Sequence, residues 1–176
     1  MPEFACCSRR WWLAGCMGAA VGCRRATESF PMPRQKRWLH ASDPRQRVIK
    51  FNDPDIGEYV VRDIQPGTPA SWTFDHPEMT FPVEPRAGLR FVMRFGIHER
   101  TFRDTGPVTV SVKINGHALG SLYCKQPNDY TLDLPVPLDW IEAGEPVHVL
   151  AEASPLWIAP DGVRLGYLIE EAGFRW

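Results

Sequence analysis

Strict alternation of apolar and polar side chains marks the centre of this chain. Between residues 88 and 98 large apolar residues take every second position, and Arg90, Arg94 and His98, along with Val92, take the opposite phase. Successive side chains of a strand point to opposite faces of a sheet, so a period of two predicts a half-buried strand. The inward face is expected to consist of Leu89, Phe91, Met93, Phe95 and Ile97.

A second alternating segment, at residues 107–115, runs directly into a turn signal. Asn115-Gly116 follows it, and both central positions of a type I′ turn need a positive φ, which these residue types tolerate. The pair therefore predicts a hairpin whose return strand covers 117–123. The inward face of the first strand is expected to be Val108, Val110, Val112 and Ile114.

Shorter segments of the same kind recur along the chain, and helical periodicity is nearly absent. We expect strands at 47–51, 58–64, 70–74, 79–83, 130–134, 147–151 and 164–174, the last with a bulge near Gly166 or Gly173. A single helical turn is expected over 138–143, because Gly144 follows as a stop. Many short strands separated by turns predict an all-β fold, an antiparallel sandwich of jelly-roll type over residues 47–176.

The first residues indicate an export signal. Arg9-Arg10 stand before a stretch, residues 11–23, that is apolar and uncharged. That stretch is shorter than the ~20 residues of a membrane span and has the length of a signal-peptide core. Ser8-Arg9-Arg10 followed by large apolar residues resembles a twin-arginine signal. The resemblance implies an exported protein of the bacterial cell envelope.

The same stretch resembles a lipoprotein signal, in which small residues precede a lipidated cysteine. Cys16 has the better local match, but Cys23 leaves a longer apolar core, so we favour Cys23 as the lipid anchor and keep Cys16 as the alternative. Cleavage before Cys23 would leave Cys124 as the one remaining thiol, and no intramolecular disulfide is then expected.

Charge separates the linker from the domain. Residues 24–50 hold eight Lys or Arg and two Asp or Glu. Residues 51–176 hold ten Lys or Arg and eighteen Asp or Glu, so the linker is basic and the domain is acidic. Residues 24–46 are also proline-containing and lack an apolar period, so they predict a disordered or extended basic tether between a signal at 1–23 and the domain. An acidic domain repels phosphates, and nucleic acid is therefore not expected as a partner.

The domain resembles a family of bacterial jelly-roll modules, the galactose-binding-like β-sandwiches that accompany glycosyltransferases, methyltransferases and cell-surface proteins. The likeness runs from about Gly57 to Trp176 and rests on spaced landmarks. In those modules the last landmark reads Asp, one residue, Arg, then Leu-Gly, whereas here Gly162 and Val163 both stand between Asp161 and Arg164. The other landmarks are Gly57, Asp63, Trp72, the segment 107–116, the segment 134–137 and the segment 155–160.

Catalytic signatures are missing from the sequence. It has no Gly-x-Ser-x-Gly, His-Glu-x-x-His, phosphate-loop or dinucleotide motif. Adjacent Glu170 and Glu171 point to opposite faces of a strand and so do not flank one bond. Asp75-His76 is expected in a polar loop between two strands. We therefore expect no enzyme activity, no catalytic residue, no metal site and no cofactor.

Tryptophans near turns are the strongest binding signal, since indole faces pack against sugar rings. Trp72 is expected in the core. Trp140 and Trp157, with Asp161 and Arg164 close behind, are the candidate ligand-binding residues at one end of the sandwich. The competing interpretation makes Trp140 an end cap and has Asp161 pair with Arg164 across a turn.

Two classes of function remain open. The first is an exported, membrane-anchored module without catalysis that binds envelope or extracellular polysaccharide. The alternative is a structural lipoprotein that docks on another envelope protein and has no carbohydrate ligand. In both, the lipid anchor would supply the contact with the membrane.

Overall fold

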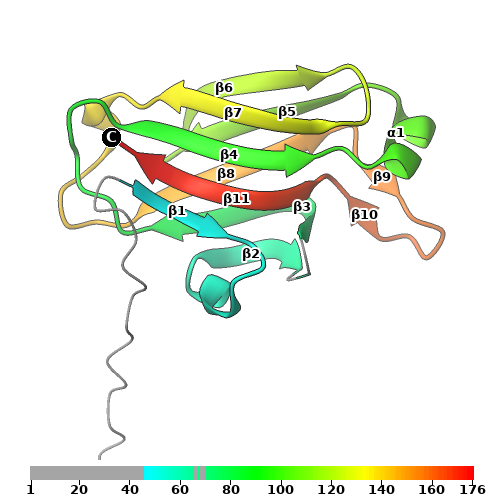
Figure 1. The fold of residues 1–176 in the computed structure, drawn as a ribbon, viewed down its shortest axis with the longest axis horizontal. Coiled ribbons are helices and arrows are strands. Elements are labelled where there is room, and N and C mark those ends of the chain that lie inside the picture. Colours follow the sequence, from blue (N-terminus) through cyan, green and yellow to red (C-terminus); the bar gives the residue numbers. More distant parts are fainter. Residues whose placement is uncertain (1–45, 66, 68–69) are drawn as a thin grey trace, which may run out of the picture. The chain divides into compact units, whose positions relative to one another are not determined.

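The computed structural model describes residues 46–65, 67 and 70–176, which form an antiparallel β-sandwich (Figure 1). The predicted signal, Cys23 and nearly all of the predicted tether lie outside the described residues. Each strand pair in the described part is antiparallel, so the predicted all-β sandwich of jelly-roll type is confirmed. None of the described helices is long and apolar enough to cross a membrane.

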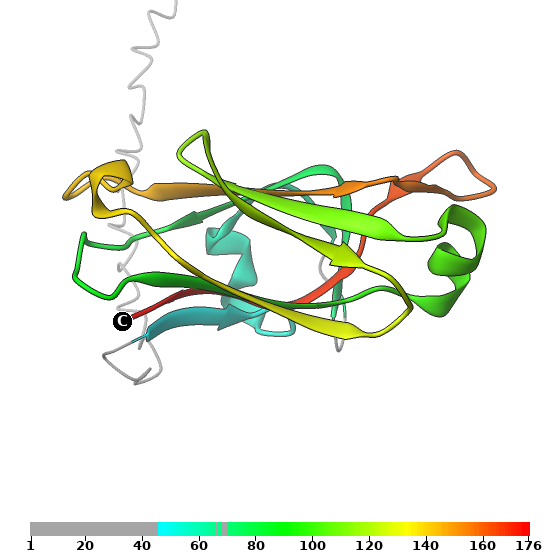
Figure 2. The ribbon, with the colours of Figure 1, turned by 90° about the horizontal axis from the view of Figure 1, so that it is seen from above.

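Two layers of strands enclose the core (Figure 2). The long strand β3 (Ser71–Phe81) links them: it belongs to the second layer, and its first residues, Ser71 and Trp72, also pair with β11 (Leu168–Arg175) of the first layer. The first layer contains, in spatial order, β1 (Gln46–Lys50), β11 (Leu168–Arg175), β4 (Arg90–Gly96) and β7 (Asp129–Pro135). The second contains β2 (Val60–Gln65), β3 (Ser71–Phe81), β8 (Val147–Ser154), β5 (Val108–Ile114) and β6 (His117–Cys124).

Short elements lie near the ends of the layers. A small hairpin and a helix share one end, and a single helical turn lies at the other (Figure 2). The hairpin is β9 (Trp157–Ile158) and β10 (Arg164–Leu165), the helix is α1 (Glu99–Thr105), and the turn at the opposite end is η2 (Leu138–Trp140). A further turn, η1 (Pro54–Glu58), precedes β2.

The core is built from the alternating positions of the sequence. All residues predicted to point inward from 89–97 and 108–114 are at most 4% exposed. Phe174 of β11 lies in the core, where its ring centroid is 5.5 Å from that of Phe81 and 5.4 Å from that of Phe91. Asn115 and Gly116 have φ of 47° and 83°, as the predicted type I′ hairpin between β5 and β6 requires.

The prediction of separate strands at 70–74 and 79–83 is wrong, because β3 runs through both. The ladder between β3 and β8 begins at Glu78, directly after Pro77. A proline has no N–H to give to a ladder, which explains why the sequence looks interrupted there. Asp75 and His76 therefore lie within a strand and not in the loop predicted for them.

The last predicted strand is divided in two. Gly166 and Tyr167 separate β10 from β11, since the N–H groups of both residues donate to Thr73, at 2.8 Å to its carbonyl and 2.9 Å to its Oγ1. These bonds hold the chain against β3 and break the regular ladder. The bulge lies between Ile169 and Glu171, not next to either glycine that the sequence suggested.

Helix prediction was incomplete. The turn expected over 138–143 exists as the shorter η2, but α1 and η1 were missed. α1 has no apolar period, and its first cap is unusual, because His98 Nδ1 accepts the Arg100 N–H at 3.2 Å. η1 carried a readable signal, since Asp53 caps it and Pro54 follows at the first helical position.

Candidate functional site

The structure places the predicted ligand-binding residues at two ends of the sandwich. Trp157, Asp161 and Arg164 lie together on the β9–β10 hairpin, beside α1. Trp140 lies in η2 at the opposite end, where its carbonyl accepts from Asn115 Nδ2 at 2.7 Å and its ring stacks on His117 at 4.9 Å (Figure 2). The predicted sharing of one end by Trp140 and Trp157 is wrong, because β8 lies between them and spans about 25 Å.

We call the part of the molecule formed by α1, the β9–β10 hairpin and the first residues of β3 the α1 end. Trp157 is its central side chain. Its indole Nε1 donates to Asp104 Oδ2 at 2.9 Å, and the guanidinium of Arg100 lies 5.6 Å from the ring centroid. Trp157 is half-buried and is not among the residues that pack on the hydrophobic core. The ring is thus held by polar contacts from α1.

The hydrogen bond from Trp157 also affects the electrostatics of this end. It is the main reason that the pKa of Asp104 is lowered, and Arg103 and Arg100 lower it further. Asp104 is therefore a carboxylate at neutral pH and keeps the indole in one orientation. A ring fixed in advance costs less entropy when a ligand packs on it.

Trp72 is the functional candidate that sequence reasoning placed wrongly. It was expected in the core, but in β3 the inward positions are Ser71 and Thr73, both 0% exposed. Their hydroxyls donate to the carbonyls of Phe51 at 3.2 Å and Tyr167 at 2.9 Å, respectively. Trp72 consequently points outward, is half-buried, and lies with its ring centroid 6.0 Å from that of His98.

Trp72 and Trp157 belong to the same end because both contact α1 or its cap. Trp72 meets His98, the residue before the helix, and Trp157 meets Arg100 and Asp104 within it. The β9–β10 hairpin adds exposed apolar surface, since Ile158 is 66% exposed. The sequence carried no direct signal for this grouping, because α1 itself was not predicted.

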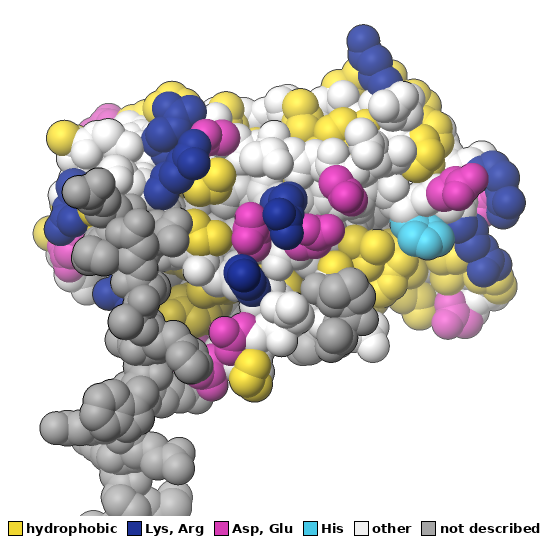
Figure 3. Space-filling model, viewed as in Figure 1, with side chains coloured by type: hydrophobic (Ala, Val, Ile, Leu, Met, Phe, Trp, Pro, Cys, Tyr) yellow, Lys and Arg dark blue, Asp and Glu magenta, His cyan; other side chains and the backbone are white. Residues whose placement is uncertain are grey.

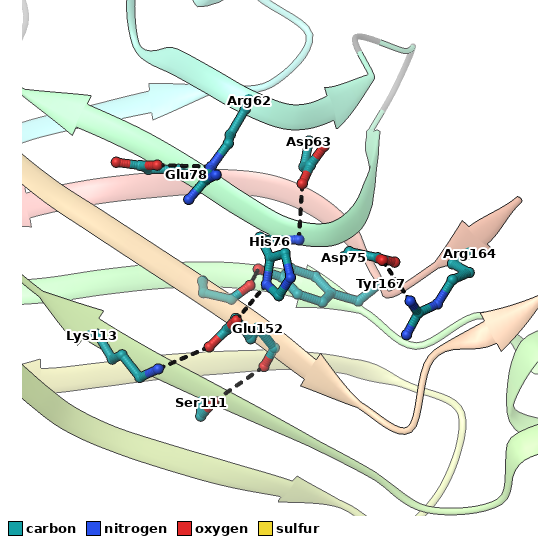
Figure 4. Close-up of polar contacts among 11 residues, drawn as sticks. Arg62, Asp63, Asp75, His76, Glu78, Ser111, Lys113, Glu152, Arg164 and Tyr167 are labelled. Atoms are coloured by element: carbon teal, nitrogen blue, oxygen red, sulfur yellow. Dashed lines mark hydrogen bonds and ion pairs between the residues drawn. The ribbon is translucent and has the colours of Figure 1, made fainter. Parts of the chain in front are cut away.

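Arg164 does not pair with Asp161. Its Nη1 lies 2.8 Å from Asp75 Oδ2, while Asp161 Oδ1 accepts the Val163 N–H at 3.2 Å within its own turn (Figure 4). The pairing across the turn is therefore corrected. The other oxygen of Asp75, Oδ1, is buried and has no hydrogen-bond partner in the described part of the chain. A guanidinium has five N–H donors, so Arg164 keeps donors beyond the one that it gives to Asp75.

A second polar area covers the outer face of β2, β3, β8 and β5 (Figure 4). Glu152 lies between His76, at 2.7 Å from its Nδ1, and Lys113, at 3.1 Å from its Nζ. The contact with His76 is the main reason that the pKa of Glu152 is lowered. Glu78 is held in the same way, by Arg62 at 2.9 Å and His148 at 3.1 Å.

The carboxylates of this face are paired with cations and histidines from neighbouring strands, which is how a solvated sheet face is stabilised. No group of three or more His, Cys, Asp or Glu in the described residues is arranged to hold a metal ion. The α1 end, with its two outward tryptophans, is the better candidate for binding.

We expect truncation of Trp140 and truncation of Trp157 to reduce the stability of the domain by different amounts. Trp140 packs on the core, so Trp140→Ala is expected to cost about 3 kcal/mol, the lower part of the range for a buried aromatic. Trp157→Ala removes one hydrogen bond and a cation–π contact outside the core and is expected to cost about 1 kcal/mol. Urea unfolding of the two variants measures the difference. Equal losses would make Trp157 a structural cap as well.

Comparison with known proteins yields structural matches only. No protein-family model matches the chain, and no curated protein sequence does. Among solved structures, a family 35 carbohydrate-binding module from Clostridium thermocellum is 16% identical with a TM-score of 0.43, covering 74% of this chain and 98% of that one. The C-terminal CBM6 of the laminarinase LamC from Zobellia galactanivorans is 13% identical with a TM-score of 0.41, covering 74% and 99%.

An acetyl xylan esterase, Est2A from Butyrivibrio proteoclasticus, is also similar, at 13% identity and a TM-score of 0.44. The match covers 73% of this chain but 32% of that enzyme, so the chain corresponds to one part of a longer protein there. Similarity of this degree transfers neither a ligand nor a binding residue. What the domain binds has to come from its own side chains.

Proposed function

We propose that this chain is a module without catalytic activity that binds polysaccharide through the α1 end. The observation that carries the proposal is the pair of half-buried tryptophans, Trp72 and Trp157, which lie outside the core and contact one short helix or its cap. Indole rings provide flat apolar surfaces for the apolar faces of sugar rings. Loops held on a rigid sandwich are the usual location of binding residues.

Polar groups around the rings would give orientation to a bound sugar. Arg164 has guanidinium donors beyond the one it gives to Asp75. The indole N–H of Trp157 is already engaged by Asp104, so the ring face and not its N–H would contact the sugar. A few placed polar groups beside an apolar surface are typical of small-molecule sites.

Retardation in polysaccharide gels tests the proposal. The full chain would be run in native gels that contain xylan, laminarin, galactan or hydroxyethylcellulose. We expect at least one to slow the wild-type chain and Trp157→Ala to migrate as in an empty gel. The control is Trp176→Ala at the opposite end (Figure 1), since Trp176 is also half-buried with a guanidinium, that of Arg86, 4.7 Å from its ring. Trp176 packs on the core whereas Trp157 does not, so urea unfolding first has to show that both variants are folded. Equal loss in both variants, or no retardation of the wild type, would contradict the proposal.

Docking on an envelope protein is the second candidate, and one observation favours it. Ile158 and Val163, on the β9–β10 hairpin, are 66% and 40% exposed. Exposed apolar side chains on a protruding hairpin suit a protein partner. Ile158→Ser separates the two functions, because it should abolish protein docking and leave retardation by polysaccharide unchanged.

We further propose that the chain is exported and anchored through Cys23. Replacing Arg9 and Arg10 together by Lys should keep the protein in the cytoplasm, because a receptor reads the arginine pair. Cys23→Ser should release the protein from membranes, whereas Cys16→Ser should not. Cell fractionation measures both results. Release by Cys16→Ser alone would move the anchor to Cys16, and normal export of the double Lys variant would remove the twin-arginine interpretation.

A further inference from the structure

A small pocket opens on the outer face of the layer formed by β1, β11, β4 and β7, well away from the polar face of the other layer. Its volume is about 210 Å³. Val48 and Val92 contribute its apolar surface, with Thr131 beside them. We call it the sheet-face pocket. Figure 3 shows basic and acidic side chains next to one another across the middle of this face.

The hollow follows from strand register. Gly173 of β11 pairs with Val48 of β1 on one side and Val92 of β4 on the other. The row across the sheet thus has no side chain between two valines. A Cβ on Gly173 would come within 2.0 Å of the Arg47 carbonyl, so no larger residue fits while β1 stays in place. Gly173 therefore lets β1 pair closely with β11 and leaves a gap between the side chains of Val48 and Val92.

Cations surround this apolar floor. Lys50, Arg94 and Arg175 line the pocket, and Glu171 is the one acidic residue among the lining side chains. Both arginines are paired with acidic side chains at or beside the pocket, Arg94 with Glu170 and, at 3.9 Å, with Glu171, and Arg175 with Asp133. An anionic ligand would therefore be bound by individual N–H donors and not by a net positive charge of the surface.

Each cation keeps donors for a ligand. Arg94 uses its Nε on Glu170 at 2.6 Å, and one Nη of Arg175 bonds Asp133. A guanidinium has five N–H donors, so both retain others. Lys50 is exposed and forms no ion pair with any other described residue. Arg donors of this kind pair well with a carboxylate, in favourable cases through two parallel bonds.

We propose that the sheet-face pocket binds a uronic-acid residue, the carboxylated form of a sugar ring. The valines would contact the apolar face of the ring, while Lys50, Arg94 and Arg175 would bind its carboxylate. The volume of about 210 Å³ is below the roughly 300–1,000 Å³ of pockets for drug-sized ligands, so it suits one ring. This site is separate from the α1 end and does not depend on it.

Amide chemical shifts of the full chain test the site. Sodium D-glucuronate, D-glucose and sodium acetate would be titrated separately at low ionic strength. We expect glucuronate alone to shift the amides around Val48, Val92 and Thr131, saturably, and added salt to weaken its binding. Equal shifts with acetate would reduce the site to an anion contact, and equal shifts with glucose would show that the cations have no role. Either result overturns the proposal.

Charge removal at the rim supplies the matched comparison. Lys50→Gln should weaken glucuronate binding about fivefold, the loss of one exposed charge-assisted contact. Lys125→Gln makes the same charge change at an exposed lysine outside the pocket and should leave binding unchanged. Trp157→Ala should also leave it unchanged, which distinguishes this site from the α1 end. Equal weakening by Lys50→Gln and Lys125→Gln would contradict the assignment.

Discussion

Val110→Asp is expected to prevent folding. Val110 lies at the middle of β5, is 0% exposed, and pairs with Leu122 of β6 and Ala153 of β8. An aspartate there would place a carboxylate in the core with no cation facing it, which costs several kcal/mol or forces the group to take up a proton. Domains are stable by about 5–15 kcal/mol, so such a loss removes most of the folded population.

Circular dichroism and urea unfolding would show the effect. The matched control is Thr109→Asp, on the adjacent position of the same strand, where the side chain points to the outer face, is half-buried and lies opposite Tyr123 and Ser154. We expect Thr109→Asp to unfold near the wild-type midpoint and Val110→Asp to show no cooperative transition. Similar midpoints for both would mean that the strand faces are assigned wrongly.

Tyr167→Ala is the second change with a large expected effect. Tyr167 is 0% exposed, its ring lies 5.1 Å from that of Phe95, and its hydroxyl donates to the Ala151 carbonyl at 2.9 Å. Truncation should cost about 3–5 kcal/mol, as for other buried aromatic residues. Tyr167→Phe keeps the ring and removes only the hydrogen bond, so it should cost about 1 kcal/mol. Equal costs would mean that packing of the ring contributes little.

Tyr167 also predicts how stability changes in alkali. Burial raises the pKa of its hydroxyl in the folded state. The unfolded chain would release this proton above about pH 10, while the folded state keeps it. Stability is therefore intact below that pH and falls above it by about 1.4 kcal/mol per unit for this group. Tyr167→Phe should show a shallower fall in the same range, and an identical slope would contradict burial of the hydroxyl.

The architecture could be predicted from periodicity, because a strand with one buried face has apolar and polar residues in alternation. The segments 89–97 and 108–114 were predicted with their correct inward faces, and Asn115-Gly116 with its correct turn. β3 was read as two strands because Pro77 interrupts the pattern without ending the strand. α1 carried no period at all, since polar caps and tertiary contacts hold it.

The candidate sites were much less visible in the sequence, because they depend on which elements meet. Arg164 is near Asp161 in sequence, yet it pairs with Asp75 on a different strand. Trp72 was expected inside, because sequence alone does not show that Ser71 and Thr73 take the inward positions. The sheet-face pocket exists because β1 and β4 pair with β11 on either side of Gly173, and no local sequence pattern predicts which residues of these strands pair.

The indole N–H resonance of Trp157 provides the most direct test of polysaccharide binding at the α1 end. The full chain would be titrated with an oligosaccharide of whichever polysaccharide retards it in gels. We predict a saturable shift of that resonance, together with the amides of α1 and the β9–β10 hairpin, while the resonances of η2 at the opposite end stay in place. Saturable shifts confined to any other surface, with the Trp157 signal unmoved, would contradict the proposed function.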